Sequence, residues 1–527
     1  MFGFHFWVSW RRFRYIYFMY VRKKKNISGV ISVQVIDKSS GRYKVKKTIG
    51  SSSDPKVIDN LVKEGEKWIK TYQGQADIFS LFDRQEEEKQ IVSHLLSNIE
   101  KILINGSQIV LEKVYKSIGF DKVNDDILKH LVISRLSQPM SKSATVEYLK
   151  AYFDEDIHYQ KVYRYMDQLD SQTQEEIQRI SVEHTRKILG GEIGLVFYDV
   201  TTLYFESDKK DDLREAGFSK DGKHSHVQVV LGLLVSKGGY PLSYSLFNGS
   251  QFEGYTMLPV VEDFITRFKL KDFVIVADSG LMSRANIALL DSAGYKYIIG
   301  ARIKAETQQI KQWVLSLDKS EGVFYEHKKG EGRLIVGYSE KRAKMDAYNR
   351  EKGLSRLRKA FKSGKITKDN INKRGYNKFL EITKGVEVSI NQQKIREDER
   401  WDGLKGYFTN TNLPAKEVYE KYSGLWVIEN AFRVTKGTIE LRPMFHFTPK
   451  RIQAHVAICF VAYKVYKELE RILKIKQIDL SPDKVLEIAK TITTIKIRLP
   501  ISGEIMTQTM MITKRQQSIA KLINDPI

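Results

Sequence analysis

Two aspartates in this sequence have the surroundings of side chains that carry out chemistry. Asp199 and Asp278 each end an apolar run that predicts a strand, at residues 194–200 and 272–280. The carboxyl ends of strands are where α/β sheets place ligands, and a carboxylate there rarely serves packing. A single strand-end aspartate is equally able to cap a helix or to bind backbone amides. Two of them in one sheet therefore make the stronger case for a functional site.

A third carboxylate, Glu429, lies in a segment with helical spacing at residues 415–435. Tyr422 and Lys436 lie seven residues before and after it, and positions seven apart share a helix face at about 100° per residue. Arg433, four residues after Glu429, joins that face. The alternative is an ordinary solvated helix surface with a Glu429–Arg433 ion pair.

Three carboxylates from two strands and a helix are able to hold two Mg²⁺ or Mn²⁺ ions, because oxygen ligands suit these hard cations. Two such ions, roughly 3.5–4 Å apart, activate an attacking oxygen and stabilise a leaving one in phosphodiester chemistry. Asp402 is a rival third acid, but the glycine after it favours a turn. Asp199, Asp278 and Glu429 are thus the candidate metal ligands.

The composition predicts a polyanionic partner and an intracellular location. The chain has 87 lysine and arginine residues against 64 aspartate and glutamate residues, a net charge of +23, which points to nucleic acid. One cysteine excludes an internal disulfide and a zinc site built from several thiols. It favours a reducing compartment.

The opening segment does not have the pattern of a membrane anchor. The apolar run Phe2 to Trp10 ends at Arg11 after nine positions, whereas a spanning helix needs roughly 18 apolar residues or more. Its positive charges follow the apolar run, the reverse of a secretory signal. We therefore expect a cytoplasmic protein with no membrane association, starting at Met1 or at Met19.

The elements that must position the carboxylates form a mixed α/β pattern after Gly191. Strand-like runs come first, at 194–200, 226–235 and 240–247. Helix and strand then alternate to residue 301, which indicates a mixed sheet. The charged stretch 302–400 breaks the alternation and predicts an insertion, after which a strand at 404–411 and the Glu429 helix complete the core.

These patterns divide the chain into seven expected segments. They are an extension at 1–18, a β-hairpin module at 19–80, a helical accessory or DNA-binding domain at 81–190, the first part of the core at 191–301, the insertion at 302–400, the second part of the core with the Glu429 helix at 401–475, and a C-terminal tail region at 476–527.

The two aspartates, with Glu429 in the pattern Tyr422-x-x-Leu425-x-x-x-Glu429-x-x-x-x-x-x-Lys436, resemble the DDE transposases of bacterial insertion sequences. The closest resemblance is to the group with a Tyr-Arg-Glu-Lys signature, and it covers roughly residues 194–470. It implies an α/β, RNase H-like core with an insertion before the last acidic helix. It also implies that the three acids hold two divalent cations, Mg²⁺ or Mn²⁺.

The resemblance further implies the partners. Tyr422 and Lys436 would contact phosphates of double-stranded DNA, and a homodimer would pair the two element ends before strand transfer into target DNA. Leu425 stands where the family has arginine, and we expect Arg433 to supply the missing guanidinium. Such an enzyme would act at the nucleoid of a bacterial cytoplasm.

Two other functions stay open: a nuclease with the same core, and a catalytically inactive DNA-binding protein. A nuclease would cut DNA regardless of terminal repeats and would never join strands. In an inactive protein, substitution of a single acid would change no activity. Recognition of the repeats is expected in the first 190 residues, because contacts to phosphates carry no sequence information directly.

Overall fold

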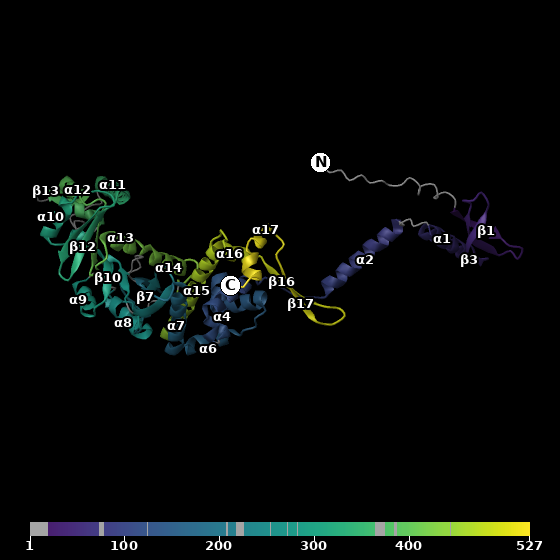
Figure 1. The fold of residues 1–527 in the computed structure, drawn as a ribbon, viewed down its shortest axis with the longest axis horizontal. Coiled ribbons are helices and arrows are strands. Elements are labelled where there is room, and N and C mark those ends of the chain that lie inside the picture. The colour runs from purple at the N-terminus through teal and green to yellow at the C-terminus, as the bar shows by residue number, and fades with distance from the viewer. Residues whose placement is uncertain are drawn as a thin grey trace. The chain divides into compact units, whose positions relative to one another are not determined.

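The computed structural model describes residues 19–526 with short gaps, at 73–77, 124, 207–208, 218–225, 253–254, 271, 282, 364–374, 384–386 and 443 (Figure 1). The predicted extension at 1–18 lies outside the described residues. The chain divides into two units: a smaller unit, Met1–Lys101 with Ile495–Thr507, and a larger unit, Ile102–Thr494 with Gln508–Ile527.

The larger unit is built around a nine-stranded mixed sheet. Its strands are β5 (Leu195–Tyr204), β6 (Glu215–Ala216), β7 (Val227–Ser236), β8 (Pro241–Asn248), β9 (Val274–Ala277), β10 (Lys296–Ala301), β11 (Phe324–Lys329), β12 (Gly332–Tyr338) and β15 (Leu404–Thr409). Their order is β11-β12-β15-β10-β9-β5-β7-β6, and β8 also pairs with β7.

The centre of this sheet has the strand order that an RNase H-like core requires. β5, β7 and β8 pair antiparallel, and β9 and β10 run parallel to β5. The spatial order β8-β7-β5-β9-β10 therefore corresponds to chain order 3-2-1-4-5. The mixed α/β fold predicted from the alternation of strands and helices is confirmed.

The strand that carries Asp199 differs from its prediction. β5 continues to Tyr204, so that Asp199 lies inside the strand rather than at its end. The antiparallel pairing with β7 extends as far as Tyr204 opposite Gln228, whereas the parallel pairing with β9 stops at Tyr198 opposite Ala277. Asp199 thus lies at the end of the parallel pairing, which a run of apolar residues does not reveal.

Helices cover both faces of the sheet. α8 (Met257–Phe268) and α9 (Arg284–Ser292) pack on one face with the side chains of Val196, Tyr198 and Ile275. The other face is covered by α13 (Ala415–Ser423), α14 (Trp426–Lys436) and α15 (Pro449–Ile475), and is called the α14 face here. Because successive side chains along each strand point to opposite faces of the sheet, the apolar residues form two separate cores.

The long helix α15 connects the sheet to the accessory helices. Thr448 caps its first turn and Pro449 opens it, which are strong helix-start signals. The accessory helices are α3 (Gly106–Ile118), α4 (Asp126–Ser137), α5 (Lys142–Tyr148), α6 (Tyr159–Gln168) and α7 (Ser171–Ile188), and α15 contacts four of them, α3, α4, α6 and α7. The buried side chains of α15 face neighbours on nearly every side.

The stretch between β10 and β15 adds strands to the main sheet as well as helices. β11 and β12 join the sheet through β15. The remaining elements are α10 (Gln308–Ser316), α11 (Glu340–Lys362), β13 (Leu380–Thr383), β14 (Glu387–Ile390) and α12 (Gln392–Glu399). Leu354, Leu357, Phe379 and Ile395 form a small separate core among them.

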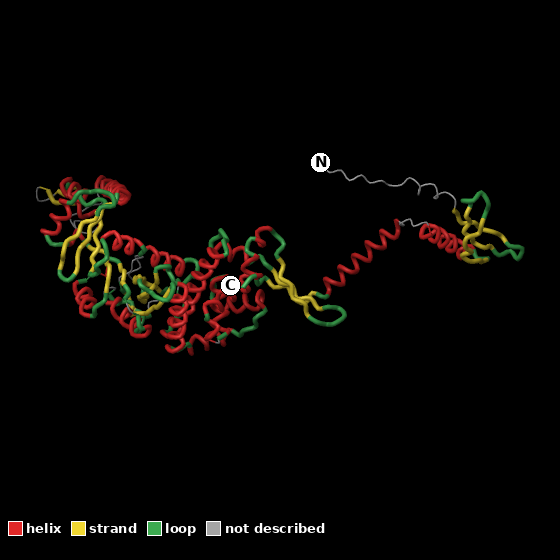
Figure 2. Tube along the Cα trace, in the orientation of Figure 1, coloured by secondary structure: helices red, strands yellow, loops and turns green. Residues whose placement is uncertain are grey.

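The smaller unit contains an antiparallel sheet of β1 (Met19–Lys25), β2 (Ile31–Asp37) and β3 (Lys44–Ser52). α1 (Pro55–Tyr72) packs against all three strands, as Figure 2 shows in red beside the yellow strands. α2 (Ile78–Ser97) follows. A second sheet, in the order β17-β16-β4, holds β4 (Ile99–Leu103), β16 (Thr493–Arg498) and β17 (Ile505–Met510), and the boundary between the units falls within these strands.

The last helices of the larger unit are α16 (Pro482–Ala489), α17 (Lys514–Gln517) and α18 (Ala520–Asn524). Among the described residues, none of the helices combines the length and the apolar character needed to cross a bilayer.

Candidate active site

Asp199 and Asp278 lie side by side on neighbouring strands. Each is the residue directly after the last parallel pair of β5 and β9, Tyr198 opposite Ala277. Tyr198 and Ala277 point into the core under α8 and α9. Because successive side chains alternate between faces, both aspartates lie on the α14 face. The backbones of the two neighbouring strands are roughly 4.8 Å apart.

Glu429 approaches the same face from a helix. α14 packs Ile428, Ala431 and Phe432 into the core of the α14 face, and it contacts β5 and β7. Glu429 itself is exposed in the first turn of this helix. The described ion pairs include none between Glu429 and Arg433, so the pair expected for a merely solvated surface is not formed.

The single helix expected at 415–435 is two helices. α13 ends at Ser423 and α14 begins at Trp426. Gly424 lies between them, where a Cβ atom would be 2.7 Å from the ring of Phe197 on β5. The chain therefore comes so close to the sheet at this point that only glycine fits, and Tyr422 and Glu429 belong to different helices.

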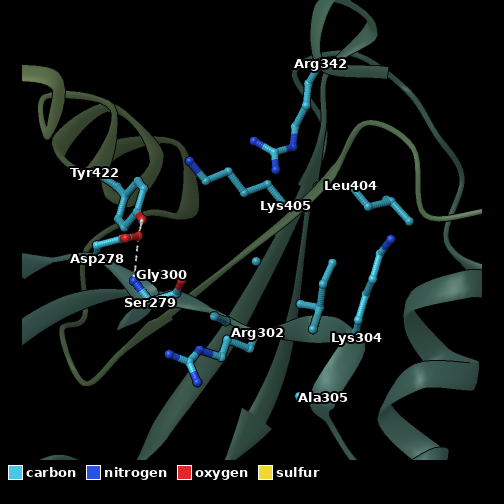
Figure 3. Close-up of a pocket in the computed structure, with 13 residues that line it drawn as sticks. Asp278, Ser279, Gly300, Arg302, Lys304, Ala305, Arg342, Leu404, Lys405 and Tyr422 are labelled. Carbon is cyan, nitrogen blue, oxygen red and sulfur yellow. Dashed lines mark hydrogen bonds between the residues drawn. The ribbon is translucent and has the colours of Figure 1, made fainter. Parts of the chain in front are cut away.

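The carboxylate of Asp278 is held by two donors (Figure 3). The backbone N–H of Ser279 donates to Oδ1 at 2.7 Å, and the hydroxyl of Tyr422 donates to the same oxygen at 3.3 Å. Tyr422 is 4% exposed. Burial, and then the negative charge of Asp278, raise the pKa of Tyr422, so its hydroxyl stays protonated and remains a donor.

A cationic pocket of about 530 Å³ opens beside Asp278 (Figure 3). Four cations line it, namely Arg302, Lys304, Arg342 and Lys405. Lys304 is paired with Asp398 at 2.8 Å and Arg342 with Asp346 at 3.6 Å. Lys405 forms no ion pair within the described part of the chain. The pocket therefore suits an anionic group such as a phosphate.

Lys405 connects two of the candidate ligands electrostatically. Burial, and then the charge of Arg342, lower the pKa of Lys405, whereas Asp278 and Glu429 act in the opposite direction. Its Nζ lies 4.5 Å from the centroid of the Tyr422 ring. Asp278 and Glu429 thus both lie close enough to Lys405 for their negative charges to raise its pKa. The described residues nevertheless include no group of three or more His, Cys, Asp or Glu side chains spaced to hold a metal ion.

The remaining predicted DNA contacts lie elsewhere on α14. Arg433 is exposed and lines a second pocket of about 800 Å³, together with residues of α15 and of the segment leading into α16. Lys436 is partly buried, with Nζ 6.0 Å from the ring centroid of Phe432. Leu425, at the position of the signature arginine, is only 8% exposed and belongs to the core.

None of the four cations of the pocket was predicted from the sequence. Lys405 had a signal, because it is a lone lysine in an otherwise uncharged strand. Arg342 had none, since it belongs to the strongly charged helix α11. The rival acid Asp402 is bound to Arg350 through two contacts of 2.6 Å, and Gly403 after it has φ +78°. The turn predicted there is confirmed.

The chain matches a protein family described as "Transposase DDE domain" over residues 190–464, just over half of its length. No curated protein sequence matches it. Among solved structures, a piggyBac transposase synaptic complex with hairpin DNA is 10% identical, with a TM-score of 0.38 over 72% of this chain and 70% of that one. A Mos1 transposase paired-end complex with a left transposon end is 12% identical, with a TM-score of 0.15 over 30% of this chain and 53% of that one.

The family match covers the sheet of the larger unit from β5 to β15. That match spans β5, β9 and α14, and with them all three candidate carboxylates. Members of the family use divalent metal ions. The chain therefore belongs to the DDE transposases, enzymes that cleave DNA and transfer its strands.

Proposed function

We propose that this transposase acts on the two ends of a bacterial insertion sequence and that Asp199, Asp278 and Glu429 hold its divalent ions. One observation carries the proposal: the in-register pairing of β5 with β9 gives Asp199 and Asp278 adjacent positions on the face that α14 covers. Glu429 then approaches that face from α14. The exposure of Asp278 and Glu429 and the partial exposure of Asp199 leave these carboxylates accessible to ligands.

The side chains present fit a hard cation. All three candidate ligands offer carboxylate oxygens, which Mg²⁺ and Mn²⁺ prefer. When bound there, two such ions supply activation of the attacking oxygen and charge stabilisation of the leaving one. The protein's own contribution is to orient the acids, as the Ser279 amide and the Tyr422 hydroxyl do for Asp278.

We propose that the DNA contacts near the cleaved bond come from Tyr422, Arg433 and Lys436. Tyr422 lines the cationic pocket beside Asp278, where a backbone phosphate would meet Lys405. Arg433 and Lys436 would contact the duplex further along α14. Two copies of the chain would hold the two ends together in one complex.

The test is cleavage of a labelled duplex that spans the boundary of the element, with Mg²⁺ or Mn²⁺. The unmodified protein should cut at one defined position, and it should join the freed 3′ end to target DNA. Asp199→Ala and Glu429→Gln should abolish cutting but still bind DNA, because the basic surface is kept. Glu420→Gln on the exposed side of α13 is the matched control and should cut normally.

Other outcomes assign other functions. Cutting of any duplex without joining would indicate a nuclease with this fold. Binding without cutting by the unmodified protein would indicate an inactive copy. Normal cutting by Glu429→Gln would remove that residue from the ligand set.

A further inference from the structure

The sheet of the smaller unit has two chemically different faces. α1 covers one of them: a Cβ atom added to Gly65 on α1 would lie 3.0 Å from Val21 and 3.3 Å from Ile49. Two lysines also point to this side. Lys23 pairs with Asp59 on α1 at 3.1 Å, and Lys47 lies over the ring of Trp68 on α1 at 5.4 Å.

The opposite face carries a polar row across all three strands, and on β2 this row lies between the buried side chains of Ser32 and Ile36. Because neighbours along a strand point to opposite faces, Arg22 lies opposite to Val21 and Lys23. Arg22 is paired in register with Gln34, and Gln34 with Thr48. Directly opposed residues share a face, and Nη2 of Arg22 donates to Oε1 of Gln34 at 3.1 Å. Arg22, Gln34 and Thr48 are called the polar row below.

The polar row keeps hydrogen-bonding groups to spare. Nε of Arg22 is buried and has no partner among the described residues, so the open groups of the row belong to Gln34 and Thr48. The described hydrogen bonds likewise include none from the amide nitrogen of Gln34 or from the hydroxyl of Thr48. Arg22 and Gln34 are half-buried and Thr48 is exposed. Such a row can still bind a partner that offers both donors and acceptors.

The charge around the polar row is complementary to DNA. The stretch that forms the three strands, residues 19–52, holds nine lysine and arginine residues and one acid, Asp37. Asp37 is itself paired with Lys46 at 3.5 Å. Lys24 follows Arg22 by two residues, so it lies on the same face, opposite Ser32. This local excess supplies the contacts to phosphates that position a protein on a duplex.

The dimensions and residue types favour the major groove. Three strands roughly 4.8 Å apart span about 10 Å, and the major groove is about 12 Å wide. Arginine pairs with two acceptors of guanine there, and glutamine with the donor and acceptor of adenine. Strands are an established means of contacting base edges in a groove.

We propose that this face of the β1–β3 sheet enters the major groove of double-stranded DNA and that the polar row recognises base pairs of the element's ends. The proposal rests on the proposed function for the identity of that DNA. It assigns base contacts to Arg22 and Gln34, and phosphate contacts to Lys24 and the neighbouring lysines.

The test compares binding of the full chain to an element-end duplex and to a scrambled duplex of equal length, in one salt concentration. Arg22→Lys keeps the charge but loses the paired donors of a guanidinium, and Gln34→Ala removes the amide. Each should weaken binding to the end duplex about ten-fold or more, and should change binding to the scrambled duplex less than about three-fold. Thermal unfolding like that of the unmodified protein establishes that the variants are folded.

The matched control is Lys23→Ala, which removes a cation from the same strand on the face toward α1. It should lower binding to both duplexes equally and slightly, because it takes away charge without touching the polar row. Equal losses on both duplexes for Arg22→Lys and Gln34→Ala, or no loss, would overturn base recognition by this face.

Cleavage separates this proposal from the proposed function. If the unmodified protein prefers the end duplex, loses that preference in Arg22→Lys, and never cuts, the polar row stands and the catalytic assignment fails. If Arg22→Lys and Gln34→Ala both cut and prefer the end duplex as the unmodified protein does, the catalytic assignment stands and the polar row fails.

Discussion

The hydroxyl of Tyr422 donates a hydrogen bond of 3.3 Å to Oδ1 of Asp278. This contact ties the last turn of α13 to the end of β9, two elements far apart in the chain. The ring of Tyr422 is packed edge-on against Tyr407, at 4.9 Å between centroids, with Lys405 above it. The aromatic residue of the signature thus positions an acid at the edge of the cationic pocket.

Tyr422→Phe should slow cleavage while leaving the fold intact. The ring keeps its packing, but Asp278 loses one of its two donors, and one net hydrogen bond contributes about 1 kcal/mol. The expected loss in single-turnover cleavage rate is therefore about five- to ten-fold. The substitution Tyr419→Phe, on the exposed side of the same helix, serves as control. An unchanged rate in Tyr422→Phe would show that the hydroxyl does not orient Asp278.

Lys405→Met should tighten binding of Mn²⁺ in the absence of DNA. The lysine lies in the field of Asp278 and Glu429, so it competes with a divalent cation for the same carboxylates. Removing the charge while keeping an unbranched apolar side chain should lower the dissociation constant several-fold, measured by titration calorimetry. Lys304→Met is the control, because Lys304 is paired with Asp398 instead. Weaker Mn²⁺ binding by Lys405→Met would mean that the lysine organises the acids rather than competing for them.

Leu425→Arg should destabilise the protein rather than restore the signature. Leu425 is only 8% exposed within the core of the α14 face, and an unpaired charge placed there costs roughly 2 kcal/mol or more. Thermal unfolding should shift to lower temperature. Trp426→Arg at the neighbouring position, which is 63% exposed, should have little effect on stability. Full stability and faster cleavage by Leu425→Arg would instead show that the site accepts the signature arginine.

Lowering the pH should decrease the stability of the protein, because Glu468 on α15 becomes protonated. This side chain is fully buried, and burial alone would raise its pKa. The hydrogen bonds from Arg471 and the nearby His184, whose Nε2 lies 3.6 Å from Oε1, outweigh that effect and lower the pKa of Glu468 to about 2. A lowered pKa in the folded protein stabilises it above the ordinary value near 4.5, and this stabilisation is lost as the pH falls from there toward 2. This stabilisation by Glu468 contributes about 3 kcal/mol to the free energy of unfolding.

Glu468→Gln should therefore lower the free energy of unfolding at pH 7 and flatten its dependence on pH below 4.5, measured by urea unfolding. Glu417→Gln is the control, because Glu417 forms a partly exposed pair with Lys421 on α13, and such pairs contribute little. The same loss for both variants would contradict a special role for Glu468.

Local patterns in the amino-acid order were sufficient for most of the core strands and for the position of Asp278 after β9. Apolar runs and alternation depend on neighbours in the chain, so β7, β8 and β15 lie within a residue or two of their predicted ranges. Asp278 directly follows β9 as expected. The smaller unit was only partly predicted, because the weak, basic strand β1 lacks apolar alternation and pairs with β2 to extend the expected hairpin.

Long-range pairing accounts for what the chain order did not reveal. The break between α13 and α14 follows from the contact of Gly424 with Phe197, more than 200 positions earlier. The register of β5 against β9 aligns Asp199 with Asp278, and the fold of β15 and α11 brings Lys405 and Arg342 to the same pocket. Residue types and spacing predict candidate acids. Which cations lie beside Asp278 depends on backbone hydrogen bonds and close packing between distant segments, and no local pattern encodes these.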